Sequence, residues 1–460
     1  MSSYRKTLTA VSAAFLAIAA AAETVVYDGV TYTVEDATVS PARVCVGTNT
    51  DGVPAVDAYG ELTLEIPGSF TVGGKTYTVA RIGEFAFKGC GNLKGVVIPA
   101  TVTSIGKSAF QYSGLTSVVI PGSIESIGGD YCFDSCGSLE EVVIEDGVRI
   151  VDRYAFRYCS KLKKVVFPGS ISRIRDAAFR QTAITDLVLP PKVTNLEYGV
   201  FSRCYSLTNL VLHSNVRYIG ADGAGAFSEC TSLTEVTIPD SVASISAPAF
   251  DGCRNLSRVT VPQLVVDSGL TNVFRSAAAS IVDVTLSGNA TAVSAHTFEG
   301  CVNLRRIVIP DSVTSIAEGA FDGLTELEEV TIPPNVAGLN AATFSGCDKL
   351  WSRWYRALSD GAYDLSGAIG DKKIASLSVS GDASLDDFVL RDGKVYDALV
   401  VVENKASNAV TLTLPGGFRY VAPAGKKPLS LPAKSLNLLT ITRVSNDTFL
   451  VTRQKLQEID

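Results

Sequence analysis

The sequence has few charged side chains, which make up 19% of its 460 residues. Its 40 lysines and arginines are scattered rather than clustered, and 47 acidic residues leave a net charge of −7. Nucleic-acid phosphates and anionic membrane surfaces both bind clustered positive charge. We therefore expect neither nucleic acid nor a lipid surface as a partner.

A hydrophobic run long enough to cross a bilayer is also missing. The longest apolar stretch, near the N-terminus, spans about 15 residues, fewer than the ~20 that a membrane-spanning helix needs. Arg5 and Lys6 precede it, and Ala20-Ala21-Ala22 stands before Glu23. A positive segment, an apolar segment and small residues at a cleavage site are typical of a secretory signal peptide. We expect residues 1–22 to be this signal and the mature protein to be secreted or at the cell surface, without a membrane span.

One repeat accounts for most of the chain. A phenylalanine returns at spacings of 22 to 26 residues, most often 23, and its surroundings return with it. Ala109 precedes Phe110, for example, and Leu115 and then Val118–Pro121 follow. The repeated phenylalanines are Phe87, Phe110, Phe133, Phe156, Phe179, Phe201, Phe227, Phe250, Phe274, Phe298, Phe321 and Phe344.

Each repeat is interpreted as one coil of a stack. Val96 and Ile98 alternate with outward residues, so they face inward from a short strand. Pro99 ends the strand because proline has no N–H to donate. A second extended piece leads to the Ala-Phe segment, where we expect one short helical turn. A unit of this size cannot bury its own apolar face, so the coils must stack and their strands must pair in a parallel, in-register sheet.

The repeat pattern I-G-x-x-A-F-x-x-C-x-x-L-x-x-V-x-I-P runs from about residue 82 to 350. It resembles the BspA-like leucine-rich repeats of bacterial and protist surface proteins. The resemblance implies a curved solenoid with an adhesive or protein-binding role outside the cell, and it supplies no catalytic residues. The seventh repeat has an insertion at Ala221–Gly223, and the ninth, Leu270–Leu286, lacks the cysteine. Regular curvature is not expected at these two places.

The expected fold class is a β-rich leucine-rich-repeat solenoid with short parallel strands and single helical turns, placed between two other β-rich parts. Residues 23–81 carry hairpin signals at Asp28-Gly29 and Gly73-Gly74, and they predict an N-terminal β cap with the first half-repeat. Residues 82–362 predict the solenoid of about twelve repeats, with a C-terminal cap that contains both tryptophans. Residues 363–460 lose the period and predict a small all-β domain, a sandwich or jelly-roll.

Ten cysteines in an exported protein raise the question of disulfides. Eight of them share one repeat position, three residues after the phenylalanine, where other repeats have Ser113, Thr182 or Leu324. Such a position needs a small buried group rather than a partner, and stacked side chains hold their Cβ atoms too far apart for a disulfide without distortion. We expect free thiols. If a disulfide exists, Cys136–Cys159 or Cys230–Cys253 is the expected pair.

Groups that could carry catalysis are scarce. The two histidines, His213 and His296, are four coils apart, or about 20 Å at the usual strand spacing, so they cannot share a metal or a nucleophile. The acidic pair Glu140-Glu141 faces Lys163-Lys164 one repeat later, as lateral neighbours of opposite sign in a sheet do. The same alternation is expected of Arg305-Arg306 with Glu328-Glu329 and of Glu235 with Arg258. We expect no enzyme, no metal and no cofactor.

The outward position in the middle of each longer strand is the candidate binding site. It is valine in the first six repeats and mostly threonine afterwards. The preference of β-branched residues for strands accounts for such a column by itself. Six exposed valines in a row would also form an apolar strip, however, and such strips mark interaction sites. The six are Val97, Val119, Val143, Val166, Val188 and Val211.

Two functions follow from this reading. The first is an adhesion or protein-binding scaffold, secreted or on the cell surface, whose sheet face holds a protein or glycoprotein ligand or another copy of the chain. The flanking residues have mixed charge, which favours a protein over a strongly charged ligand. The alternative is a structural subunit of a surface layer or filament that assembles through its ends or its C-terminal β domain.

Overall fold

The computed structural model describes residues 23–56, 61–220, 225–331, 333, 336 and 341–350, together with the strands between 374 and 458. The predicted signal peptide, the insertion at Ala221–Gly223 and the tryptophans Trp351 and Trp354 therefore lie outside the described residues.

The chain divides into two compact units. The first contains the residues up to Asn209 and also Tyr218–Cys230. The second contains Leu210–Arg217 and the residues from Thr231 onward.

The first unit begins with a small sheet that contains both predicted hairpins. Asp28 and Gly29 have φ of 51° and 73°, as the tight turn between β1 and β2 requires. Gly73-Gly74 connects β5 to β6 in the same way. The C-terminal end of β6 pairs in parallel with β8, the first shorter strand of the coils. Its role as a cap stays a prediction. The strands are β1 (Thr24–Tyr27), β2 (Val30–Asp36), β3 (Ala42–Val46), β5 (Ser69–Val72), β6 (Lys75–Ile82) and β8 (Ser104–Ile105).

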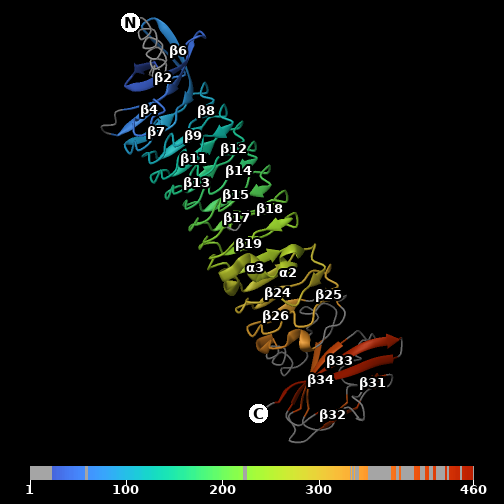
Figure 1. Ribbon diagram of the computed structural model, residues 1–460. Helices are drawn as coiled ribbons and strands as arrows, with labels where there is room; N and C mark the ends of the chain where they lie inside the picture. Colours follow the sequence, from blue (N-terminus) through green and yellow to red (C-terminus); the bar gives the residue numbers. More distant parts are fainter. Residues whose placement is uncertain are drawn as a thin grey trace, which may run out of the picture. The chain divides into compact units, whose positions relative to one another are not determined.

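Each following coil contributes one longer and one shorter strand (Figure 1). Val118, Val142 and Val165 are lateral partners, which confirms the predicted parallel register. The longer strands are β4 (Leu62–Glu65), β7 (Leu93–Val97), β9 (Ser117–Ile120), β11 (Glu141–Ile144), β13 (Lys164–Val166) and β15 (Asp186–Val188). The shorter strands after β8 are β10 (Ser126–Ile127), β12 (Ile150–Val151), β14 (Arg173–Ile174), β16 (Asn195–Leu196) and β18 (Tyr218–Ile219).

A column of phenylalanine rings forms the core of these coils. Phe110, Phe133 and Phe156 are fully buried. The Phe133 centroid lies 4.9 Å from that of Phe110 and 5.2 Å from that of Phe156, with nearly parallel ring planes. Since each ring is covered by the rings of the neighbouring coils, a single coil has no complete core of its own.

In the coils of the first unit the Ala-Phe segments are not the helical turns that the sequence predicted, whereas helices do occur at this place in two later repeats, at Leu270–Phe274 and Ala341–Phe344. Around Phe133, Tyr131 and Ser135 have φ of 71° and 61°, which a right-handed helix cannot contain. The N–H groups of Tyr131, Phe133 and Ser135 donate to the carbonyls of Arg153, Ala155 and Arg157 in the next coil, at 3.1, 2.8 and 2.7 Å. Because alternate N–H groups pair with the neighbouring coil, the turns form a third ladder beside the two columns of strands.

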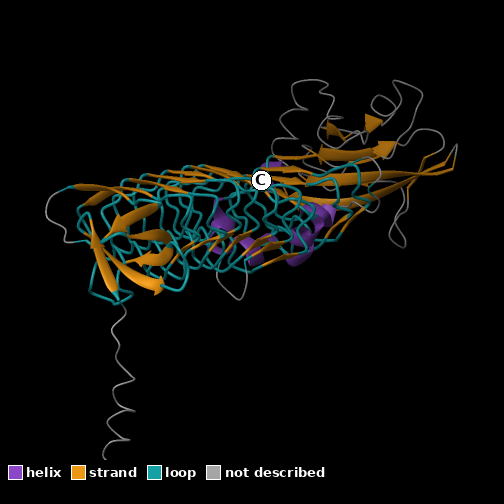
Figure 2. Cartoon of the chain, turned by 90° about the horizontal axis from the view of Figure 1, so that it is seen from above, coloured by secondary structure: helices purple, strands orange, loops and turns teal. Residues whose placement is uncertain are grey.

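The second unit continues the repeat, with helices just before and within the irregular ninth repeat. The helices α2 (Gln263–Ser268), α3 (Leu270–Phe274) and η1 (Arg275–Ser280) follow one another there, and η2 (Ala341–Phe344) lies in the last described coil (Figure 2, purple). The longer strands are β19 (Glu235–Thr237), β21 (Arg258–Val261), β22 (Asp283–Leu286), β24 (Arg306–Val308) and β26 (Glu329–Thr331). The shorter ones are β20 (Ser244–Ile245), β23 (Ala292–Val293) and β25 (Ser315–Ile316), and β17 (Asn209–Val211) spans the boundary of the units.

The described C-terminal strands form two sheets, ordered β27-β29-β33-β34-β31 and β28-β30-β32. These strands lie within residues 363–460, for which the sequence predicted a small all-β domain. A sandwich or jelly-roll stays a prediction. The strands are β27 (Ile374–Val379), β28 (Ala383–Ser384), β29 (Ala398–Asn404), β30 (Val410–Thr413), β31 (Phe418–Tyr420), β32 (Ser430–Leu431), β33 (Ser435–Ser445) and β34 (Thr448–Glu458).

All ten cysteines are free and buried. In the repeat position the thiol donates to the phenylalanine carbonyl of the preceding coil, as Cys159 does to Phe133 at 3.1 Å. Thr182 supplies a hydroxyl donor to the Phe179 carbonyl at 3.0 Å. The position therefore suits a small side chain with a donor, which explains why cysteine, serine and threonine recur there. Leu324 shows that the donor is dispensable in one coil.

Candidate functional site

The outward valines lie on the exposed face of the longer strands, above a buried layer. Val97, Val119 and Val188 keep 54%, 48% and 62% of their surface exposed, Val166 and Val211 are also exposed, and Val143 is half-buried. Val118 and Val142, which face inward, are buried. This contrast confirms the predicted alternation along the strands. Val211 belongs to the second unit and the other five valines to the first.

Charged side chains next to these columns pair from coil to coil. Four predicted pairs are formed: Glu141–Lys164 at 2.7 Å, Glu235–Arg258 at 2.8 Å, and Arg305–Glu328 and Arg306–Glu329 at 3.8 Å each. Glu140 and Lys163 form no side-chain ion pair within the described coils, although the Lys163 N–H donates to the Glu140 carbonyl at 3.0 Å. Pairs this exposed stabilise a fold by about 0–1 kcal/mol, so they act mainly on register and solubility.

The sheet beneath the valines is interrupted. The longer strands of the first unit fall into the order β4-β7, then β9-β11-β13, then a new sheet that begins with β15. Both breaks come before a strand whose preceding loop is one residue shorter. The loops Ser113–Leu115 and Thr182–Ile184 correspond to Cys90–Leu93 of the first repeat, and each is one residue shorter than it. A shorter loop alters how the following strand meets the preceding coil.

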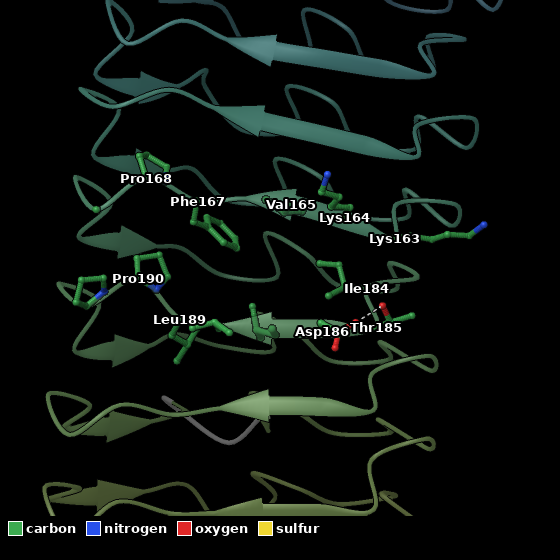
Figure 3. Close-up of a pocket in the computed structure, with 14 residues that line it drawn as sticks. Lys163, Lys164, Val165, Phe167, Pro168, Ile184, Thr185, Asp186, Leu189 and Pro190 are labelled. Atoms are coloured by element: carbon green, nitrogen blue, oxygen red, sulfur yellow. Dashed lines mark hydrogen bonds between the residues drawn. The ribbon is translucent and has the colours of Figure 1, made fainter.

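An apolar groove of about 550 Å³ opens at the second break, between β13 and β15 (Figure 3). Its lining includes Val165, Phe167, Ile184, Leu187, Leu189 and Pro190, with charged groups from Lys163, Lys164 and Asp186. Val165 is half-buried, whereas Val118 and Val142 at the same repeat position are buried. The groove thus makes accessible a part of what is core in the other coils.

A cluster of tyrosines around Arg157 was not predicted from the sequence. The guanidinium carbon lies 5.1, 4.9 and 4.6 Å from the ring centroids of Tyr131, Tyr154 and Tyr158, and Nε lies 2.7 Å from buried Asp134. Burial acts to lower the pKa of Arg157, but the hydrogen bond and the charge of Asp134 raise it above its usual value. The sequence signal was a tyrosine two residues before each of two successive repeat phenylalanines. Tyr154 and Tyr158 belong to the same coil as Arg157, whereas Tyr131 and Asp134 belong to the preceding coil, so the cluster also joins two neighbouring coils of the stack.

Groups that could hold a metal do not gather in the described part of the chain, where no three His, Cys, Asp or Glu side chains are suitably placed. His296 Nδ1 lies 3.4 Å from the Glu299 carboxylate, and His213 Nδ1 accepts a hydrogen bond from the Asn215 N–H at 3.1 Å.

None of the described helices has the length and apolar character that crossing a bilayer demands.

The repeat geometry agrees with a family model. The BspA type leucine rich repeat region matches the chain in six copies, over residues 75–130, 128–223 and 222–351. These segments cover more than half of the sequence. The chain belongs to the BspA-type leucine-rich repeat family. This confirms the family that the repeat pattern suggested and the leucine-rich-repeat solenoid with little helix.

Three solved structures are similar to this BspA-type chain. A leucine rich cell surface protein from Faecalibacterium prausnitzii A2-165 is 22% identical, with 74% of this chain and 99% of that chain covered and a TM-score of 0.38. A leucine-rich repeat protein from Bacteroides ovatus ATCC 8483 is 19% identical, with 81% and 99% covered and a TM-score of 0.35. The pneumococcal vaccine antigen PcpA is 16% identical, with 63% and 93% covered and a TM-score of 0.34. No curated protein matches the chain.

Proposed function

We propose that this BspA-type repeat protein is a binding scaffold, secreted or on the cell surface, that holds a protein or glycoprotein on the outward face of its longer strands. The observation that carries the proposal is the exposure of valines at one repeat position above a buried layer. Val119, Val143 and Val166 are direct lateral partners, so their side chains form one contiguous patch. Covering such a patch is favourable by roughly 25 cal/mol per Å² of apolar surface.

The location outside the cell rests on the N-terminal segment and on the family. Arg5 and Lys6, the apolar stretch and the alanines before Glu23 have the composition of a signal peptide. Repeats of the BspA type are typical of surface proteins, which agrees with export. An enzymatic role is not proposed, because the charged side chains of the sheet face pair with one another from coil to coil instead of converging on a cleft.

The test is a screen of the full chain against arrays of proteins and glycoproteins, followed by surface plasmon resonance on the hits. We expect the double variant Val119→Lys/Val166→Lys to weaken binding at least about tenfold, a loss of ~1.4 kcal/mol. Its thermal stability should stay nearly unchanged, since exposed substitutions usually cost within about 0.5 kcal/mol.

The matched control is Thr260→Lys/Thr285→Lys, which places two lysines at the same repeat position in the second unit. Binding by this control at the wild-type level supports the valine patch as the site. Equal loss in both variants shows that the first repeats are not special. Full binding by both variants moves the site off the sheet face and contradicts the proposal.

A further inference from the structure

The coils stay close together at the first break in the sheet, between β7 and β9, whereas a groove opens at the second, between β13 and β15, and the residues at the two breaks explain the difference. Before β9 the shortened loop contains Gly114, and a Cβ built there would meet the Gly91 carbonyl oxygen at 1.9 Å. The two coils approach so closely only because glycine has no side chain. The Gly114 N–H then donates to the Cys90 carbonyl at 3.0 Å, and Thr116 to Lys94 at 3.0 Å. The coils at the first break therefore stay in contact.

At the second break the residue in the place of Gly114 is Ala183. Its methyl group excludes the close approach that glycine permits, and in the described coils Ala183 makes no hydrogen bond to the Cys159 carbonyl. The coil of β15 is therefore held away from the coil of β13 at this side.

The large side chain of Phe167 also lies between the two coils at this break. The other repeats carry isoleucine, leucine or valine at this position, for instance Ile98 and Ile144. The Phe167 ring packs edge-on against Phe179 of the next coil, with centroids 5.5 Å apart and an interplanar angle of 82°. Figure 3 shows the Phe167 ring pointing from the coil of β13 toward the coil of β15.

The coils separate at one side only. The turn ladder is intact, with the Phe156 N–H donating to the Ala178 carbonyl at 2.8 Å. The shorter strands are also paired, through Ile174 and Leu196. Since two of the three sides remain closed, the groove is a fixed wedge-shaped opening on the face that carries the valines.

The opening leaves two strand edges facing each other without their usual bonds. Where a longer strand begins, two successive N–H groups usually donate to one carbonyl of the preceding coil. The N–H groups of Lys163 and Lys164 donate to the Glu140 carbonyl in this way, and those of Thr208 and Asn209 donate to the Thr185 carbonyl. The matching bonds from Thr185 and Asp186 to Lys163 are missing from the described coils. Backbone groups at such edges pair readily with another extended chain.

We propose that this groove binds an extended peptide segment of a partner protein, which lies between β13 and β15 as an added strand. An extended segment offers N–H and C=O groups along its sides, so it can pair with an open strand edge in the groove. Its inward side chain is apolar, because Val165, Phe167 and Leu187 line the place where it enters. This inference rests on the proposed function and names the class of partner.

The positive charge of Lys163 at the groove favours an acidic residue in the bound segment. Lys164 is paired with Glu141 at 2.7 Å, whereas the Lys163 ammonium forms no ion pair with any described residue. An acidic residue of the segment that lies beside Lys163 gains a partner there. The segment therefore combines alternating apolar residues with a carboxylate next to the first of them.

The experiment uses a fluorescein-labelled synthetic peptide with the sequence of Leu139–Ile144, a strand of this chain that has the required pattern, and the full-length protein. Fluorescence polarisation should show saturable binding, with a Kd below about 1 mM. The variant Ala183→Gly/Phe167→Ile recreates the residues of the first break and closes the groove. It should weaken binding at least about tenfold while unfolding at a temperature no lower than the wild type.

Two controls locate the site. A peptide with serine in place of its two inward residues, which correspond to Val142 and Ile144, should not bind. Lys163→Ala should weaken peptide binding several-fold, whereas Lys161→Ala, outside the groove, should leave it unchanged. Should the double variant fail to fold, the single variants Ala183→Gly and Phe167→Ile replace it, and each should show part of the loss.

The inference is overturned if Ala183→Gly/Phe167→Ile or its single variants bind the peptide as tightly as the wild type. It is also overturned if the wild type shows no saturable binding. Val97→Lys, which lies outside the groove, should not affect the peptide. If the peptide fails while array partners still depend on Val119 and Val166, the groove is rejected and the proposed function stands. If the peptide binds but no array partner depends on the valines, the proposed function is rejected instead.

Discussion

At the scale of single residues, the repeat cysteines are hydrogen-bond donors in a closed core. Burial raises the pKa of Cys204 to about 11, although hydrogen bonds to Thr182 and Gln181 oppose the shift, so the thiol is protonated at neutral pH. Its Sγ lies 3.3 Å from the Phe179 carbonyl oxygen, to which it donates. A buried thiol of this kind is a poor nucleophile, which agrees with a structural role.

The raised pKa of Cys204 predicts a loss of stability in alkaline solution. The unfolded thiol titrates near its ordinary value of 9.0 and the folded thiol near 11. The contribution of the protonated thiol is therefore complete below pH 9 and falls as the pH rises toward 11. Thermal unfolding of the wild type and of Cys204→Ser should show a Tm difference that is constant below pH 9. Above it the wild type should lose stability faster, because serine does not titrate in this range. A difference that stays constant up to pH 11 would contradict this assignment.

At the scale of the strand and its loop, one side chain decides how closely two coils approach. Gly114→Ala places a methyl group where the Gly91 carbonyl oxygen would be 1.9 Å away. The coils must then separate, at a cost of about 1–3 kcal/mol for overpacking. We expect faster amide exchange at Gly114 and Thr116, whose bonds to the preceding coil would break. Gly169→Ala, with open space around the added Cβ, is the control. Unchanged exchange at Gly114 and Thr116 would show that the close approach is not needed.

The strands themselves were predictable from the sequence, because their information is local and repeated. Alternating residues such as Val118 and Val119 specify which side faces the core, and the ion pair of Glu141 with Lys164 follows from the register alone. The helical turns were predicted wrongly for the coils of the first unit, since left-handed residues such as Tyr131 and Ser135 are stabilised by bonds to the next coil, which no local pattern reveals.

The groove could not be predicted from the repeat pattern either, because it also depends on contacts between coils. The missing residue between Thr182 and Ile184 is visible in the sequence, but the same shortening occurs before β9 without an open groove. The outcome depends on Ala183 and Phe167, which belong to different coils and meet only when the coils stack. Sequence reasoning singled out the exposed valines, but it did not indicate the groove beside them.

At the scale of the whole molecule, stability is a sum over neighbouring coils. The Phe156 ring contacts Phe133 on one side and Phe179 on the other, with centroid distances of 5.2 and 5.3 Å. In the described coils the turns and the shorter strands likewise pair with the adjacent coils. A defect in such a stack is confined to the coils that share the interface.

Phe156→Ala should therefore cost about 3–5 kcal/mol, the range for a buried phenylalanine, but act locally. In hydrogen-exchange mass spectrometry we expect lost protection in peptides that contain Phe133, Phe156 and Phe179. Protection should persist in β3 of the first sheet and in β24 of the second unit, because neither belongs to a sheet of the altered coil. Tyr112→Ala, a similar truncation of a ring that is 55% exposed, should leave exchange unchanged throughout. If Phe156→Ala instead lowered protection evenly along the chain, the coils would unfold as one cooperative body. Binding at the groove would then be coupled to the stability of distant repeats rather than to its own coils.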